Sequence, residues 1–191
     1  MGWTALLPFK PPAQRKSRLA GLLAPDARIA LSQLLFDRVI RALEGSGKVG
    51  AIHLLAADRP AGWTGGWHAD LGRGLNVEIE VACAAIGRSP LLVLHADLAL
   101  LQPMDVDVLL DAAEQVGRAI APDRHGQGTN AVALYDDRPF AFAFGTGSLA
   151  AHRSQGPAAL VDRLGLTLDV DSPDDLAAAM AHGFRADGNS S

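Results

Sequence analysis

Trp3-Thr-Ala-Leu-Leu-Pro8 is an apolar run that predicts a buried strand, and the segment after it is basic, Lys10-Pro-Pro-Ala-Gln-Arg-Lys-Ser-Arg-Leu19. Four of the chain's 17 basic residues fall within nine consecutive positions of this second segment. A basic loop at the end of a first strand is where α/β proteins hold anions, because ligands bind at the carboxyl edge of the sheet. A solvated basic turn is the alternative interpretation, and the spacing alone leaves both open.

The composition is typical of one globular domain. The 191 residues are 49% hydrophobic and 20% charged, and we expect one domain over residues 1–185 with a polar tail over 186–191. A net charge of −4 argues against binding to nucleic acid. We expect a cytoplasmic protein that does not enter a membrane. No apolar stretch approaches the ~20 residues that span a bilayer, no secretion signal is evident, and the single Cys83 cannot form an intramolecular disulfide.

Strand and helix signals alternate along the chain, which predicts an α/β layered sheet. Positions 31, 35, 39 and 43 are apolar at helical spacing, and they predict a helix that begins near Pro25 and ends at the glycines of 45–47. Residues 58–74 are rich in glycine and carry two tryptophans, which indicates a loop. The other expected elements are strands at Val49–Ala56, Leu91–His95, Asn130–Tyr135 and Phe140–Phe144, and helices over 76–87, from Pro103 and from Ser172.

Three aspartates stand where a metal could be held beside a nucleotide. Asp97 comes directly after an apolar strand, and the carboxyl end of a central strand is a favourable place for a metal ligand. Asp169 and Asp171 would face the same side of a strand, where two carboxylates repel each other unless a cation such as Mg²⁺ neutralises them. The alternatives are that Asp97 caps a turn and that Asp171 helps to start the next helix. We interpret His95 as a core residue rather than a ligand.

Two glycine-rich turns could bind an anion through their backbone amides. Gly126-Gln-Gly-Thr-Asn130 precedes a strand, and Phe144-Gly-Thr-Gly-Ser148 precedes a short helix. Either could be an ordinary turn, since glycine, asparagine and serine are common turn residues. Together, however, two such turns, a basic loop and three aspartates form a set that is much less expected by chance than any one member.

Read together, these segments resemble the CofC/FbiD family of guanylyltransferases of deazaflavin coenzyme F(420) biosynthesis. The resemblance covers nearly the whole chain in the same order, and its specific motifs are Lys16-Ser-Arg-Leu19, Asp123-Arg-His-Gly-Gln-Gly-Thr-Asn130 and Asp169-Val-Asp-Ser-Pro173. It implies a single-domain α/β fold with a mixed, mainly parallel sheet flanked by helices, of the nucleotide-diphospho-sugar transferase (MobA-like) type. It also implies transfer of GMP from GTP to the phosphate of 2-phospho-L-lactate, phosphoenolpyruvate or 3-phospho-D-glycerate, with release of pyrophosphate.

The resemblance assigns a role to each candidate site residue. It implies Mg²⁺ as cofactor, GTP and a small phosphorylated acid as partners, and a homodimer as a plausible assembly. By motif match, the catalytic residues are Lys16, Arg18 and Asp97, the nucleotide-binding residues are Lys10, Lys16, Ser17, Arg18, Gly74 and Asn76, the acceptor-binding residues are Thr129, Gly145 and Ser148, and the metal ligands are Asp97, Asp169 and Asp171.

The sequence departs from the family pattern between Asp58 and Gly74. This stretch is short, and a loop rich in glycine and tryptophan stands where the family has a helix, which bears on guanine selectivity. Two other readings stay open. One is a nucleotidyltransferase that acts on a molybdopterin or a sugar phosphate. The other is a non-catalytic nucleotide-binding paralogue, which would be expected to lack at least one of the three aspartates.

Overall fold

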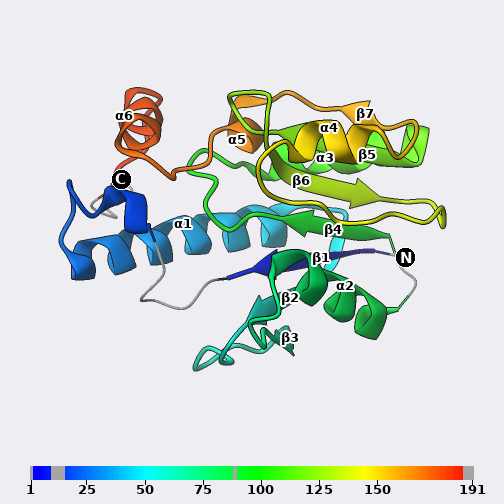
Figure 1. Cartoon of the computed structure of the whole chain (residues 1–191), viewed down its shortest axis with the longest axis horizontal. Coiled ribbons are helices and arrows are strands. Elements are labelled where there is room, and N and C mark those ends of the chain that lie inside the picture. Colours follow the sequence, from blue (N-terminus) through cyan, green and yellow to red (C-terminus); the bar gives the residue numbers. More distant parts are fainter. Residues whose placement is uncertain (1, 10–15, 88–89, 187–191) are drawn as a thin grey trace.

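Seven strands form one mixed sheet in the order β3-β2-β1-β4-β6-β5-β7 (Figure 1). The computed structural model describes residues 2–9, 16–87 and 90–186. Strand β6 runs antiparallel to β4 and β5, whereas the other four neighbouring pairs are parallel. This confirms the predicted mixed, mainly parallel sheet. The strands are β1 (Trp3–Pro8), β2 (Val49–Ala56), β3 (Gly66–Ala69), β4 (Leu91–Leu94), β5 (Arg118–Pro122), β6 (Thr129–Leu134) and β7 (Ala159–Leu160).

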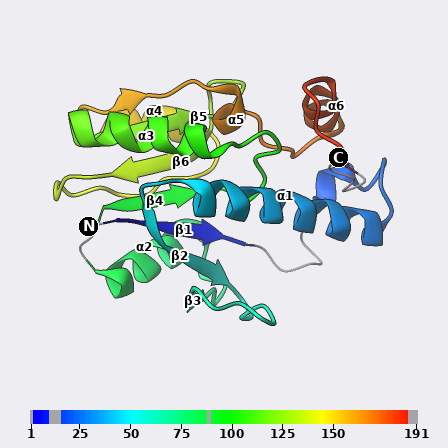
Figure 2. The ribbon, with the colours of Figure 1, turned by 180° about the vertical axis from the view of Figure 1, so that it is seen from behind.

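Helices cover both faces of the sheet. Figures 1 and 2, taken from opposite sides, show α1 and α3 on one face and α2 and α4 on the other. Side chains that alternate along a strand therefore enter two different cores: Ala5 and Leu7 pack toward α1 and α3, and Leu6 packs toward α2. The helices are α1 (Pro25–Gly45), α2 (Leu75–Ile86), α3 (Pro103–Val116), α4 (Ser148–Arg153), α5 (Leu164–Thr167) and α6 (Pro173–Ala181), with a short 3-10 helix at Ser17–Leu19.

A third apolar cluster lies at the carboxyl end of the sheet and anchors two segments that carry candidate site residues. Leu19, which follows the basic segment, is fully buried in it together with Leu35 of α1. Leu168 and Val170, the two neighbours of Asp169, are buried in the same cluster. Burial of a leucine side chain contributes roughly 1.5–3 kcal/mol. The cluster therefore ties the basic segment and the segment of Asp169 to the same end of α1.

The prediction of a loop over 58–74 was wrong in part, because β3 lies within it. This four-residue strand pairs in parallel with β2 at the edge of the sheet, and Gly66 lies beside His53. A Cβ atom at Gly66 would overlap the His53 ring, so the close approach of the two strands requires glycine there. The glycines and tryptophans that indicated a loop have a structural role at this edge of the sheet: Gly66 allows the close approach of the two strands, and the Trp63 indole donates to the Gly66 carbonyl.

The prediction of a strand at Phe140–Phe144 was also wrong. The segment has no strand pairing, and its backbone is hydrogen-bonded by side chains instead. The N–H of Ala141 donates to Gln155, that of Ala143 to His152, and that of Phe144 to Asn76. The three phenylalanines alternate because the rings of Phe142 and Phe144 pack into the core on the α2 side. The alternating phenylalanines thus indicated a buried face correctly. The backbone of the segment, however, is hydrogen-bonded by the side chains of Gln155, His152 and Asn76 and not by a neighbouring strand.

Three remaining expectations concern single features of the chain. Cys83 is half-buried against the core on the α2 side, and burial raises the pKa of its thiol to about 12, as expected for a small core residue. Among the residues described, no helix combines the length and the apolar character needed to cross a bilayer. Residues 187–191 of the expected tail lie outside the described residues, so the domain boundary at 185 stays a prediction.

Candidate active site

A cleft of about 560 Å³ opens at the carboxyl ends of β1 and β4. The end of β1, the 3-10 helix, residues 70–75 and residues 95–97 all contribute to its wall, and Asp171 reaches it from the segment before α6. In open α/β sheets this edge is the usual place for ligands. His95 packs against the core residue Phe144, in agreement with its interpretation as a core residue, and it also lines the cleft. Six predicted site residues line this cleft: Lys16, Ser17, Arg18, Gly74, Asp97 and Asp171.

Lys16 lies at the centre of the site. Its side chain is only 6% exposed, and Nζ lies 2.7 Å from Asp97 Oδ2 and 3.3 Å from Asp171 Oδ1. Its backbone is left-handed, with φ of 52°, which for a residue other than glycine is strained and recurs at functional sites. Burial alone lowers the pKa of Lys16, but the charges and hydrogen bonds of Asp97 and Asp171 outweigh it and raise the pKa. Lys16 therefore stays charged.

The basic segment was interpreted either as an anion-binding loop or as a solvated turn, and the structure gives a different answer for Lys16 than for Arg18. Lys16 is buried and paired, which rules out the solvated turn for this side chain. Arg18 fits the solvated description better, because its side chain is 77% exposed and its closest approach to Asp171 is 3.8 Å. It nonetheless borders the cleft, where a guanidinium could reach a bound anion. Lys10 lies outside the described residues, so its assignment stays a prediction.

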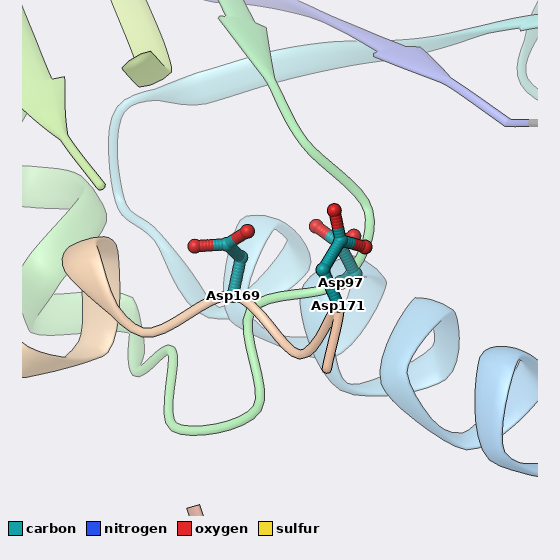
Figure 3. Close-up of side chains that lie close together, drawn as sticks. All are labelled: Asp97, Asp169 and Asp171. Carbon is teal, nitrogen blue, oxygen red and sulfur yellow. The ribbon is translucent and has the colours of Figure 1, made fainter. Parts of the chain in front are cut away.

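The three aspartates come together, as Figure 3 shows. Asp97 follows β4, and Asp169 and Asp171 come from the segment between α5 and α6. A lone antiparallel bridge between Leu98 and Asp169 joins the two segments, and the N–H of Val170 donates to the carbonyl of Asp97 at 3.1 Å. Each aspartate offers a carboxylate oxygen, and these oxygens all lie within 4.8 Å of one another.

The electrostatics of this cluster suit a divalent cation. Burial, followed by the charges of Asp97 and Asp171, raises the pKa of Asp169 to about 6, although a hydrogen bond from Asn130 acts in the opposite direction. With all three carboxylates ionised, Lys16 offsets only part of their charge. Carboxylate oxygens are the ligands that Mg²⁺ and Mn²⁺ prefer. The three aspartates therefore fit a metal site, with the ammonium of Lys16 beside it.

The helix start at Ser172 does not use the Asp171 side chain. Ser172 caps α6, and Asp175 completes the capping box by accepting from the Ser172 N–H. Asp175 Oδ2 also accepts from the Asp171 N–H at 3.1 Å, and Arg124 pairs with the other oxygen of Asp175 at 2.7 Å. Arg124 and Asp175 thus stabilise the segment that carries Asp169 and Asp171. The sequence did not reveal this role, because Asp175 looks like any capping residue.

The wall of the cleft at residues 70–75 is shaped by a side chain that the sequence analysis missed. Glu78 of α2 is buried and accepts from the backbone N–H groups of Leu71 and Arg73, at 3.0 and 2.9 Å. The Arg73 side chain and these backbone bonds lower the pKa of Glu78 to about 2, so it stays ionised. Residues 70–74 are thereby ordered around one carboxylate, where the family resemblance implied a helix.

Asn76 and the expected acceptor residues do not line the cleft. The Asn76 amide accepts from Phe144 N–H and donates to Phe144 O, so it anchors the turn that contains Gly145. Thr129 and Ser148 are 3% and 1% exposed. The Thr129 hydroxyl lies 3.0 Å from His152, whereas Ser148 Oγ is buried and has no hydrogen-bond partner among the described residues. The roles of these four residues toward ligands stay predictions.

Comparison with known proteins gives the same picture. A family model described as guanylyl transferase CofC like matches residues 3–189. A phosphoenolpyruvate guanylyltransferase of Sphaerobacter thermophilus is 34% identical over 191 residues, which cover 93% of this chain and 92% of that protein.

Solved structures share the fold at lower identity. A protein from Desulfovibrio desulfuricans assigned as a nucleotide-diphospho-sugar transferase has a TM-score of 0.72 at 17% identity, covering 92% of this chain and 85% of that one. A Mycobacterium tuberculosis protein solved with manganese has a TM-score of 0.55 at 15% identity, covering 95% and 99%. The family model matches nearly the whole chain, and the sheet topology and the cleft at the carboxyl edge of the sheet agree with that match. The chain therefore belongs to the CofC-like guanylyl transferase family.

Proposed function

We propose that this protein transfers GMP from GTP to the phosphate of a small phosphorylated acid and releases pyrophosphate. The observation that carries the proposal is the buried Lys16 held between Asp97 and Asp171 at the edge of a nucleotide-sized cleft, in a chain of this family. Phosphoenolpyruvate is the first candidate acceptor, because the Sphaerobacter relative is named for it. The product would serve coenzyme F(420) biosynthesis, as the family resemblance implies.

The chemistry requires positioning and charge neutralisation rather than a covalent catalyst. A phosphate oxygen of the acid attacks the α-phosphorus of GTP, and the bond from that phosphorus to the bridging oxygen of pyrophosphate breaks. The acid phosphate is already anionic near neutral pH, so it needs no strong base. Lys16 and Arg18 would hold the triphosphate and the departing pyrophosphate through charge-assisted hydrogen bonds. Ser17 and Gly74, which also line the cleft, would contact the nucleotide.

We propose Mg²⁺ as the metal, held by Asp97, Asp169 and Asp171. A bound divalent cation would supply charge neutralisation between the two substrates' phosphates. The raised pKa of Asp169 and the close carboxylate oxygens support this assignment. The manganese found with a structural neighbour concerns that protein, but it agrees with a divalent site in this fold. A homodimer and a cytoplasmic location stay predictions.

The presence of all three aspartates in one cluster favours an enzyme over a non-catalytic paralogue. Mass detection of the product decides between acceptors: purified protein is incubated with GTP, Mg²⁺ and each of the three candidate acids in turn. Formation of a guanosine-diphospho-acid with one of them supports the proposal. GTP consumption with a sugar phosphate or a molybdopterin, and with none of the acids, would favour the other transferase reading.

Arg18→Ala is expected to weaken GTP binding about tenfold, because it removes a charged contact to phosphate at an exposed position. Arg18→Lys should restore only part of the affinity, since a single ammonium cannot form the two parallel hydrogen bonds of a guanidinium. Titration of the nucleotide by calorimetry measures both effects. Equal GTP affinity in the wild type and the alanine variant would show that Arg18 is only a surface side chain.

Thr129→Val and Ser148→Ala are each expected to raise the KM for the acid roughly ten- to a hundredfold, because each removes a hydroxyl that we assign to a charged ligand. GTP affinity in the absence of acid should change little, since neither residue lines the cleft that holds Lys16. Steady-state kinetics with each substrate varied separates the two effects. Variants that lose GTP binding and keep the acid KM would reverse the assignment of the two pockets.

A further inference from the structure

His152 of α4 is a buried histidine that the proposed chemistry does not use. It is 1% exposed, and the rings of Phe140 and Phe144 pack against it at centroid distances of 5.3 and 5.0 Å. Both of its ring nitrogens have partners: Nε2 lies 2.9 Å from the Ala143 nitrogen, and Nδ1 lies 3.0 Å from Thr129 Oγ1. The ring thus joins the segment before the Gly145 turn to the hydroxyl of Thr129.

The Ala143 contact determines which nitrogen carries the proton. A backbone N–H can only donate, so Nε2 must accept and cannot itself be protonated. The remaining proton of the neutral ring is then on Nδ1, which must donate to Thr129 Oγ1. Burial, with a smaller contribution from His95, lowers the pKa of His152 to about 4, so the ring is neutral at pH 7.

This assignment also determines what the Thr129 hydroxyl can do. Because Oγ1 accepts from His152, its own proton is directed away from the ring. Within residues 2–9, 16–87 and 90–186, the hydroxyl has no second hydrogen bond. The N–H of Leu149 donates to the carbonyl of Gln127 at 3.1 Å, so the turn that ends at Ser148 is attached to the segment before Thr129. The Thr129 hydroxyl is a donor left available beside this turn.

We propose that His152 is a positioning residue: it orients the Thr129 hydroxyl as a hydrogen-bond donor to the anionic acid acceptor. The inference rests on the proposed function, which places the acid at Thr129 and Ser148. The ionised oxygens of the acid accept hydrogen bonds and cannot donate them, so a Thr129 hydroxyl oriented as an acceptor could not bind them. By donating to Oγ1, His152 leaves the hydroxyl proton of Thr129 free to be donated to the acid.

Two amide substitutions separate the contacts of the ring. The amide nitrogen of His152→Asn falls near the Nδ1 position and can still donate to Thr129. The amide of His152→Gln reaches the Nε2 position, where it can still accept from Ala143 but no longer touches Thr129. We expect His152→Gln to raise the KM for phosphoenolpyruvate about tenfold and His152→Asn to stay within about threefold of the wild type. The Kd for GTP should stay within about twofold in both.

Gln155→Leu is the matched control. Gln155 holds the same segment through Ala141, donating to its carbonyl and accepting from its N–H, and it has no contact with Thr129. A structural role for His152 would be shared by Gln155, whereas a positioning role would not. We expect Gln155→Leu to leave the KM for phosphoenolpyruvate within about twofold, even if its Tm falls as much as that of His152→Gln.

A double-mutant cycle completes the test. In the His152→Gln background, Thr129→Val should raise the KM about tenfold less than it does in the wild type, because the interaction that His152 orients is already lost. In the His152→Asn background it should still cost about tenfold, so the asparagine variant tests the proposal even if the glutamine variant does not fold. Two results would overturn the role of His152. One is a KM increase in the His152→Gln, Thr129→Val double variant equal to the product of the two single increases, and the other is an equal KM for His152→Gln and Gln155→Leu. A wild-type protein that guanylylates none of the three acids would instead overturn the proposed function, and this inference with it.

Discussion

Asp97→Asn and Asp169→Asn are each expected to lower turnover roughly 100- to 1000-fold. A metal at the reacting phosphates contributes several kcal/mol of charge stabilisation, and each ~1.4 kcal/mol lost corresponds to a tenfold change in rate. An amide keeps the size of the carboxylate but weakens the hold on a divalent cation. The rate of pyrophosphate release and the affinity for Mn²⁺ by calorimetry should therefore fall together in both variants.

The Asp169 variant also separates function from folding. At pH 7 the Asp169 carboxyl, with its pKa raised to about 6, is held ionised at a cost to the free energy of folding. Asp169→Asn removes this cost, so its Tm without metal should equal or exceed that of the wild type. Asp111→Asn is the control, because Asp111 pairs with a lysine outside the cleft. Near wild-type rates for Asp97→Asn and Asp169→Asn would show that these carboxylates only shape the turns.

Lys16→Met is expected to lower kcat/KM about 100- to 1000-fold, the loss typical of a single donor that stabilises developing charge. It also leaves Asp97 and Asp171 facing each other without their shared cation. Lys16→Arg should not restore activity, because a planar guanidinium differs in shape and hydrogen-bond geometry from the ammonium that lies between Asp97 and Asp171. Rates at saturating and limiting GTP measure how much of the loss is in binding and how much in turnover.

Lys48 provides a closely matched comparison for Lys16. It also bridges two carboxylates, those of Asp111 and Glu114 at 2.6 and 2.7 Å, but it lies outside the cleft. Lys48→Met should lower the Tm by no more than Lys16→Met and leave kcat/KM within about twofold, since partly exposed ion pairs contribute little. Equal losses of activity in the two variants would mean that Lys16 acts only on stability.

Much of the fold could be predicted from the sequence because its strongest signals are local. Apolar residues at helical spacing placed both ends of α1 within a residue or two, and a proline at the first helical position placed the starts of α3 and α6, the latter together with a capping box. Strand β3 and the Phe140–Phe144 segment were misjudged because their state depends on partners distant in the chain. Four residues at a sheet edge are too few for a periodic pattern, and no local signal shows that side chains will replace a strand.

The candidate site was predicted from the sequence to a similar extent, and the missing parts of that prediction have a similar cause. The position of Asp97 after a strand was predicted from the sequence, and so was the closeness of Asp169 and Asp171, although only an isolated bridge at Asp169 stands where a strand was expected. Glu78, Arg124 and His152 were missed, because a polar residue that orders a loop or turn through its contacts looks like any other polar residue in the sequence. Their effects depend on contacts across 5 to 51 residues, such as the pairing of Arg124 with Asp175. Such contacts appear only once the chain is folded.

The most direct test of the central claim is the stoichiometry of the reaction. Purified protein is incubated with GTP, Mg²⁺ and phosphoenolpyruvate, while pyrophosphate is quantified and the organic product is weighed by mass spectrometry. We predict one pyrophosphate for each molecule of guanylylated phosphoenolpyruvate, no product when the acid or the metal is omitted, and much slower turnover when ATP replaces GTP. Equal turnover with ATP, or pyrophosphate released without a guanylylated acid, would contradict the account.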